Sequence, residues 1–257
     1  MTKQHISFSE LKTWAECPYK HKLKYIDGIN GFTGNVFTAF GTAIHSVCEH
    51  IAKGELDPID YDEHFDLAFL CELKNLDEKP DNQMISQMRQ QGREISPAVF
   101  PQLKKHFGEY EVFSTEEKLY VEIEELAYKW HLKGFIDLVI KTEDGKYHIL
   151  DWKSCSWGWN AKKRSEKLVT YQLTLYKKFF CKKHNIDPAD VETHFGLLKR
   201  TAKKENVEIF RVTSGSRKTT SATKLLTDGC RTIKAANHIK NRKSCSKCEF
   251  NKTEHCK

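Results

Sequence analysis

Two aspartates and a lysine lie close together in the middle of the chain, in the segments Gly134-Phe135-Ile136-Asp137 and Asp151-Trp152-Lys153. Side chains two residues apart on a β-strand point to the same side of a sheet, so Asp151 and Lys153 would share one face. Two carboxylates beside a lysine form a hard oxygen site that suits Mg²⁺ or Mn²⁺. Such an ion can polarise a phosphodiester and activate a water, while the lysine orients the water and offsets phosphate charge. Because the pattern is short, an ordinary ion pair on a solvated strand stays open as the alternative.

The turn between the two segments decides whether Asp137 faces Asp151. A two-residue loop of Asp144 and Gly145 would place Leu138 opposite Asp151, whereas a three-residue loop, 143–145, would place Asp137 there. The three-residue loop needs a left-handed residue at its last position, and Gly145 supplies one. We therefore predict a three-residue hairpin loop and two facing carboxylates.

Four of the nine cysteines could hold a second, separate metal centre. Cys245 and Cys248 are spaced so that a tight turn can aim both sulfurs at one metal, and Cys256 follows in the same tail. Cys17, far upstream, would complete four-sulfur ligation and tie the two ends of the chain together. Four thiolates suit either an iron–sulfur cluster or zinc, and His255 keeps a zinc site with mixed ligands open.

Composition bears on where the chain works and what it binds. It has 257 residues, no run of eighteen apolar residues, and a polar start without the apolar core of a secretory signal. We therefore expect a cytoplasmic protein with no membrane partner, whose cysteines are metal ligands or buried thiols rather than disulfides. A net charge of +7, with local basic clusters, suits a polyanion such as nucleic acid; a solvated basic surface is the alternative.

A group of aromatic and basic residues follows the Asp151-Trp152-Lys153 segment directly. Aromatic rings that stack on bases, together with cations that meet phosphates, hold single strands without sequence preference. The alternative is that the tryptophans only cover a loop. The candidate DNA-binding residues are Trp157, Trp159, Lys162, Lys163 and Arg164.

Hydrophobic periodicity predicts an α/β fold with a mixed central β-sheet flanked by helices. We expect one domain, 1–257, with a mainly helical region 1–110, an α/β core 111–215, and a helix and cysteine-rich tail 216–257 that closes onto Cys17. Helices are expected from Ser7 to Tyr25 with a bend at Pro18, and at 38–53, 60–108 (broken near 77–81 and 97–101), 166–183 and 222–238. Strands are expected at 117–124, 132–140, 146–152, 192–200 and 207–212.

In this order of elements the chain resembles the PD-(D/E)xK nuclease superfamily, specifically its RecB-like branch, which has a restriction-endonuclease-like core. The segment Phe40-Gly41-Thr42-Ala43-Ile44-His45 resembles the branch's metal-binding histidine helix, and Glu117-Lys118-Leu119 its strand into the core. The two aspartate segments resemble its first metal aspartate and its (D/E)xK element. Tyr171-Gln172-Leu173-Thr174-Leu175-Tyr176 resembles the Q-x-x-x-Y helix, and the cysteines resemble the iron–sulfur staple of AddB-type and CRISPR-associated members.

The resemblance implies a role for each matching residue. Lys153 would be the catalytic lysine, and Gln172 and Tyr176 would touch the DNA backbone or brace Lys153. Glu117 is a further catalytic candidate, for which Glu116 competes. The implied Mg²⁺ or Mn²⁺ ligands are His45, Asp137, Asp151 and the Trp152 carbonyl, and the implied [4Fe–4S] ligands are Cys17, Cys245, Cys248 and Cys256, with zinc as the alternative.

The resemblance also implies an activity: a metal-dependent DNA exonuclease acting at ends or on single strands. A structure-specific or single-strand endonuclease, and a non-catalytic DNA-binding or assembly protein, are the alternatives. The absence of a P-loop pattern from the sequence indicates that any helicase is a separate partner. A phage, repair, recombination or CRISPR-adaptation role would fit, in the host cytoplasm if the protein is phage-encoded.

Overall fold

The computed structural model describes residues 4–29, 34–78 and 80–257. The chain forms two compact units, which are described separately below. The larger unit comprises Gly34–Glu117 and Phe135–Ser214, and the smaller unit comprises Met1–Thr33, Lys118–Gly134 and Gly215–Lys257. Within the described ranges, no helix has the length and apolar character needed to cross a membrane.

A mixed β-sheet forms the centre of the larger unit. Strand β3 (His131–Thr142) pairs antiparallel with β4 (Tyr147–Cys155), which pairs parallel with β5 (Val191–Lys199), and β5 pairs antiparallel with β6 (Val207–Arg211). Strand β2 (Tyr110–Glu122) pairs with β3. This mixed sheet with flanking helices confirms the predicted fold class.

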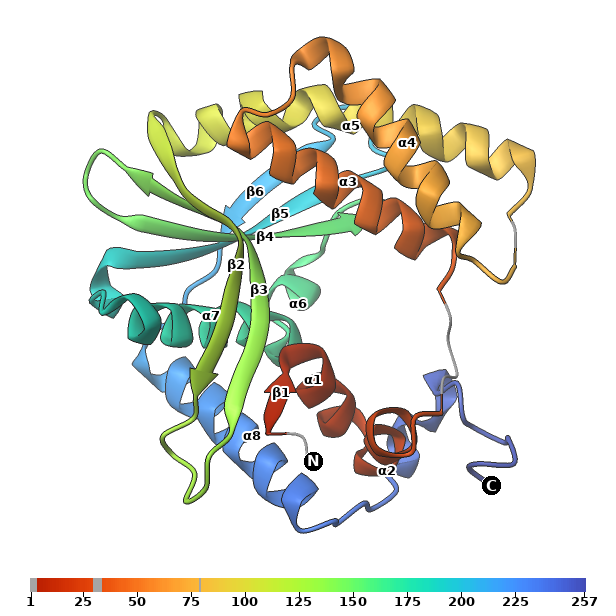
Figure 1. Ribbon diagram of the computed structural model, residues 1–257, viewed down its shortest axis with the longest axis vertical. Helices are drawn as coiled ribbons and strands as arrows, with labels where there is room; N and C mark the ends of the chain where they lie inside the picture. The colour runs from red at the N-terminus through yellow and green to blue at the C-terminus, as the bar shows by residue number, and fades with distance from the viewer. Residues whose placement is uncertain (1–3, 30–33, 79) are drawn as a thin grey trace. The chain divides into compact units, whose positions relative to one another are not determined.

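Helices cover both faces of this sheet (Figure 1). On one face, α3 (Val36–Lys53), α4 (Tyr61–Lys74) and α5 (Asn82–Phe107) build an apolar core with even-numbered β4 residues such as Leu150 and Trp152. On the other face lies α7 (Lys167–His184). Short helical segments complete the unit: η2 (Pro58–Asp60), α6 (Ala161–Arg164) and η3 (Pro188–Asp190).

Helix α3 has strong signals at both ends. The Asn35 side chain accepts from the N–H groups of Phe37 and Thr38, and the Thr38 hydroxyl accepts from the Asn35 N–H, which completes a capping box. Gly54 ends the helix in the left-handed conformation, with φ of 69°. The helix begins two residues before the predicted start.

The predicted break at 97–101 is wrong, because α5 continues through both Pro97 and Pro101. Each proline removes one helical hydrogen bond. The side chains of Ile95, Val99 and Leu103 are fully buried along this stretch, and their packing keeps the helix continuous. The other predicted break is confirmed, since α4 ends at Lys74 and α5 begins at Asn82.

The hairpin between β3 and β4 has the predicted three-residue loop. The Thr142 N–H donates to the Lys146 carbonyl oxygen at 3.0 Å, which leaves residues 143–145 in the loop, and Gly145 has φ of 82°. Leu138 is paired with Leu150. Extending this register by one residue places Asp137 opposite Asp151.

The smaller unit is built on its own short elements. Strand β1 (His5–Ser7) pairs parallel with the start of β3, and α1 (Phe8–Glu16), α2 (Pro18–His21) and the π-helical η1 (Lys22–Ile26) follow it. The Ser7 hydroxyl accepts from the Glu10 N–H and caps α1, and the helix breaks before Pro18, at the position of the predicted bend. Helix α8 (Ser216–Lys234) packs against α1 at Gly229, where a Cβ would meet Leu11 Cδ1 at 2.8 Å.

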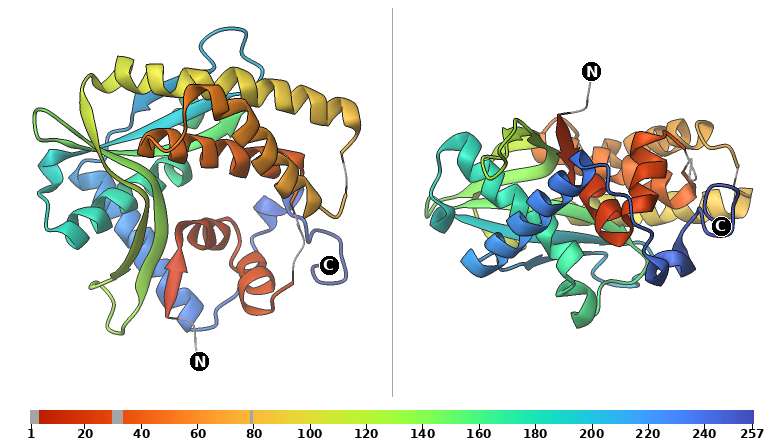
Figure 2. Two further views of the ribbon diagram at one scale, coloured as in Figure 1. Left: turned by 45° about the horizontal axis from the view of Figure 1, so that its top comes forward. Right: turned by 90° about the horizontal axis from the view of Figure 1, so that it is seen from below.

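The C-terminal tail, including η4 (Arg242–Lys247), folds back onto α2 and the turn before it (Figure 2). The Asn241 amide side chain donates to the Glu16 carbonyl oxygen at 2.8 Å, and the Tyr19 hydroxyl donates to the His255 carbonyl oxygen at 3.2 Å. An ion pair of 3.0 Å joins Lys20 to Glu249. These contacts bring segments more than 220 residues apart in sequence together.

Candidate active site

Asp137, Asp151 and Lys153 lie together on β3 and β4 of the larger unit. Asp151 is almost fully buried, at 2% exposure, and its Oδ2 forms an ion pair with Lys153 Nζ. Asp137 Oδ2 accepts a hydrogen bond of 2.7 Å from the Trp152 backbone N–H. The side chain of Asp137 is therefore anchored to the strand that carries the other two groups.

The charge of Lys153 is maintained by its neighbours. Burial opposes that charge, but attraction by Asp151 and Asp137 outweighs it and raises the pKa of Lys153 above its ordinary value. The lysine is thus a fixed cation at neutral pH, held in place by the carboxylate two residues away. A fixed cation of this kind can stabilise negative charge on a phosphate.

At Asp137 the neutral form is favoured instead of the charged form. Burial, followed by repulsion from the Asp151 carboxylate, raises the pKa of Asp137 well above its ordinary value. A bound cation would relieve both effects, since it would favour the ionised form of both carboxylates. The donor set in this region therefore fits a hard divalent ion such as Mg²⁺ or Mn²⁺.

His45, on α3, completes the predicted ligand set. Its Nδ1 lies 3.6 Å from Asp137 Oδ2. Burial lowers the pKa of His45 to about 4, so the imidazole is neutral at pH 7 and has a lone pair available. The Trp152 side chain is buried in the core, and its backbone carbonyl is the group predicted to act as a further ligand.

Gln172 and Tyr176 reach this site from α7. Gln172 Nε2 donates to Asp151 Oδ1 at 2.9 Å and lies 3.3 Å from the Tyr176 hydroxyl oxygen. Burial, followed by the nearby Asp151 charge, raises the pKa of Tyr176, so its hydroxyl stays protonated. The predicted helical pair therefore meets the carboxylate, and Gln172 holds Asp151 rather than Lys153.

Glu117 is not part of this group. Its Oε1 accepts from Lys183 Nζ at 2.6 Å and lies 2.7 Å from His184 Nε2, at the end of α7. Glu116 instead interacts with Asp151. Burial raises the pKa of Glu116 above its ordinary value, and repulsion from Glu49 and Asp151 adds to this shift. Glu116 has φ of 47°, so the strand backbone is irregular here, and simple alternation along β2 could not assign the two residues.

The predicted DNA-binding residues differ in their exposure and in their contacts with the rest of the protein. Trp157 is 75% exposed, whereas Trp159 is buried against Phe195 and Phe210, and so it is not placed to stack on a base. Arg164 is also occupied, because it donates to the Trp159 carbonyl oxygen and pairs with Glu208 at 2.6 Å.

The remaining cations of the candidate set are more available. Lys162 is exposed, and Lys163 Nζ lies 4.8 Å above the Trp159 ring. Of the five residues, Trp157, Lys162 and Lys163 are therefore the ones presented at the surface.

The four predicted cluster cysteines line a single cavity of about 270 Å³ in the smaller unit. Cys17 is buried, and its sulfur accepts from the Asn241 backbone N–H at 3.3 Å. All four thiols are free, and lysines and an arginine also line the cavity. Four thiols that line one cavity beside cations suit an anionic metal–thiolate centre, and the cavity is several times larger than one ion requires.

Comparison with known proteins identifies the family. A profile described as the PD-(D/E)XK nuclease superfamily matches residues 5–253. The chain therefore belongs to the PD-(D/E)XK nuclease superfamily. No curated protein matches the chain at a significant level.

Two solved structures resemble the chain. The first is described as a candidate exonuclease from Eubacterium rectale; it has a TM-score of 0.59 and 14% identity, and the match covers 97% of this chain and 89% of that one. The second, SSO0001, has a TM-score of 0.46 and 14% identity, and the match covers 97% of this chain and 85% of that one. The first similarity shows that the fold is shared.

Proposed function

We propose that this chain is a Mg²⁺- or Mn²⁺-dependent deoxyribonuclease that removes nucleotides from DNA ends or single strands. The observation that carries the proposal is the convergence of Asp137, Asp151 and Lys153 on two adjacent strands. Membership of a nuclease superfamily supports the reaction class. The description of a similar fold as a candidate exonuclease supports exonucleolytic over endonucleolytic cleavage.

The residues of the site have separate roles in the proposed reaction. A divalent ion held by Asp137, Asp151, the neutral imidazole of His45 and the Trp152 carbonyl would supply Lewis-acid activation of the phosphodiester and of a water. Lys153 places a permanent positive charge beside the scissile phosphate and orients the attacking water. Gln172 fixes the orientation of Asp151 through its 2.9 Å hydrogen bond.

DNA is the proposed partner, and single-stranded DNA fits the surface best. Trp157 offers an exposed ring for stacking, and Lys162 and Lys163 follow it within six residues. A separate helicase or recombination factor would supply such strands. Replacing Trp157 with alanine should reduce the free energy of single-strand binding by about 1–3 kcal/mol, the contribution of one base-stacking contact.

Digestion of linear and circular single-stranded DNA tests the proposal. With Mn²⁺ or Mg²⁺, wild-type protein should degrade the end-labelled linear substrate and leave the closed circle intact. Cleavage of the circle would show an endonuclease instead. Binding of both substrates without metal-dependent cleavage of either would show a non-catalytic DNA-binding protein.

We further propose that Cys17, Cys245, Cys248 and Cys256 hold a [4Fe–4S] cluster that fastens the tail to the first helices. The common cavity and its size support a cluster over a single zinc ion. Protein purified without oxygen should be brown and contain about four irons and four sulfides per chain. Colourless protein with one zinc bound to these cysteines would contradict the cluster.

A further inference from the structure

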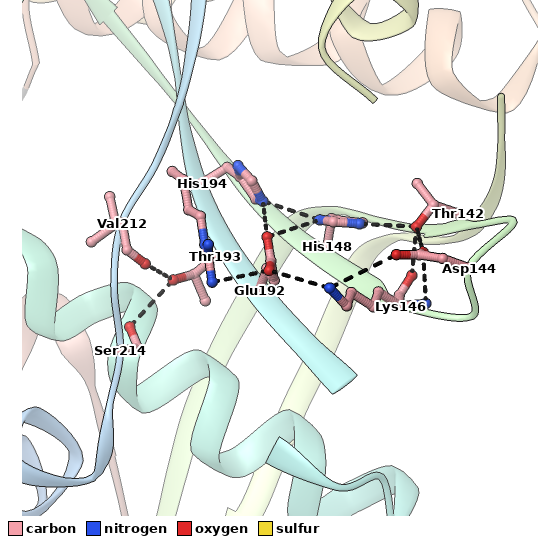
Figure 3. A network of polar contacts seen from close by, with 10 residues as sticks. Thr142, Asp144, Lys146, His148, Glu192, Thr193, His194, Val212 and Ser214 are labelled. Carbon is pink, nitrogen blue, oxygen red and sulfur yellow. Dashed lines mark hydrogen bonds and ion pairs between the residues drawn. The ribbon is translucent and has the colours of Figure 1, made fainter. Parts of the chain in front are cut away.

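A second group of metal-type ligands lies three residues before Asp151 on β4 and on the other side of the sheet. His148 is in β4, and Glu192 and His194 are in β5, where residues two apart share a face (Figure 3). Because His148 has even parity and Asp151 and Lys153 have odd parity, the two sites occupy opposite faces. Among the residues described in the structure, these three each offer one ligand atom, and the three atoms all lie within 4.8 Å of one another.

The three ligand atoms form an isosceles triangle. His148 Nδ1 and His194 Nε2 are 3.1 Å apart, and each lies 3.9 Å from Glu192 Oε2. A point equidistant from the corners of this triangle lies about 2.1 Å from each atom, which matches the bond lengths of zinc to imidazole nitrogen and carboxylate oxygen. A single ion at this point therefore needs little movement of the side chains.

The surroundings hold two of the three ligands, His148 and Glu192, in the required form. Thr142 Oγ1 lies 3.0 Å from His148 Nε2, so that nitrogen can donate a proton while Nδ1 stays free to bind an ion. Arg211 pairs with the other oxygen of Glu192, Oε1, at 2.9 Å and leaves Oε2 pointing at the two rings. An outer hydrogen bond on a metal-binding histidine and an oriented carboxylate are the usual supports of such a site.

The charge states suit metal binding as well. Burial, followed by repulsion from His148, lowers the pKa of His194 to about 3, and burial lowers the pKa of His148, so both rings are neutral at pH 7. Within the described residues, His194 Nδ1 is buried with no hydrogen-bond partner, so His194 lacks the outer hydrogen bond that Thr142 gives His148. Without an ion, a single hydrogen bond between His148 Nδ1 and His194 Nε2 links the two neutral imidazoles.

We propose that His148, Glu192 and His194 bind one zinc-class divalent ion that clamps β4 to β5 behind the candidate active site. Two nitrogens and one oxygen favour Zn²⁺ or a similar transition ion over Mg²⁺, which prefers oxygen alone. The role is structural, because the histidines are buried. The ion would stabilise the strand that carries Asp151 and Lys153 without taking part in cleavage.

Metal content in matched variants tests the site without reference to activity. Full-length wild type, His194→Ala and Glu192→Gln are stripped of metal, reloaded with Zn²⁺, freed of excess and analysed for zinc per chain. Wild type should hold one ion more than His194→Ala, whatever the cysteines or Asp151 also bind, and zinc should raise its Tm more. Glu192→Gln keeps the shape and an oxygen for Arg211, and its zinc affinity should fall about 10-fold or more.

His64→Ala is the matched control, because His64 belongs to another histidine pair of the larger unit, with ring centroids 4.5 Å from those of His50. This variant should retain the wild-type zinc content. Equal zinc content in wild type, His194→Ala and Glu192→Gln would overturn the proposal, and so would an equal loss in His64→Ala. Circular dichroism checks that each variant is folded. If His194→Ala does not fold, the zinc content of Glu192→Gln compared with wild type tests the proposal.

Discussion

Substitution of Gly196 by alanine should disturb the candidate active site through Trp152, the residue between Asp151 and Lys153. Gly196 in β5 is paired with Trp152 in β4, and a Cβ at this position would lie 2.2 Å from Trp152 Cε3. An ordinary contact is at least 3.4 Å, so the indole would have to move by about 1.2 Å. The ring is buried and cannot turn into solvent, so the displacement is passed to the strand segment Asp151–Lys153.

Two magnitudes follow from this displacement. Overpacking of a core costs about 1–3 kcal/mol of stability. A misplacement of about 1 Å in a catalytic group costs roughly 100-fold in rate. Gly196→Ala should therefore lower both the free energy of unfolding in urea and the rate of metal-dependent cleavage of labelled single-stranded DNA.

Gly215 provides the control, because a Cβ there meets no atom within 4 Å and its φ is negative. Gly215→Ala should cleave DNA at the wild-type rate. Combining Gly196→Ala with Trp152→Phe, which removes part of the indole, should recover part of the lost stability. A Gly196→Ala protein with wild-type stability and rate would refute the packing argument.

Three further predictions concern single groups. Asp137→Asn should abolish cleavage yet raise Tm at pH 8 in the absence of divalent metal. The pKa of Asp137 is raised in the folded state, so its contribution to stability is lost as pH rises through that pKa, and the two Tm values should converge at about pH 3, below the unfolded pKa. Gln172→Leu removes a hydrogen bond to a buried carboxylate and should lower kcat about 10- to 100-fold, measured in steady-state cleavage. Cys17→Ser would remove one ligand of the proposed cluster and should reduce the free energy of unfolding by roughly 2–5 kcal/mol, the range for loss of a cross-link, whereas substitution of the exposed Cys71 by serine should leave it unchanged.

The sequence predicted the part of the site that is set by local rules. Strand alternation placed Asp151 and Lys153 on one face, and the left-handed requirement at Gly145 fixed the register that sets Asp137 opposite Asp151. Helical spacing brought Gln172 and Tyr176 together. Each of these rules acts over a few residues, so one sequence contained enough information.

Other features depended on contacts between distant segments. Apolar packing carried α5 through two prolines, and the burial of Trp159 beneath Lys163 turned a candidate base-stacking ring into core. The cluster of His148, Glu192 and His194 joins two strands whose alignment is set only by the parallel register of β4 and β5. No spacing in the sequence signals that register, since the connection between the strands is long.

Metal-dependent hydrolysis of single-stranded DNA by Asp151→Asn tests the central claim most directly. Asp144→Asn is the control, because Asp144 lies in the exposed loop of the same hairpin and its carboxylate contacts Thr142 and Lys146 rather than Asp151 or Lys153. With Mn²⁺, wild type and Asp144→Asn should cleave at similar rates, and Asp151→Asn should be at least about 100-fold slower while still binding DNA. Wild-type cleavage by Asp151→Asn would contradict the assignment of Asp137, Asp151 and Lys153 as the nuclease site.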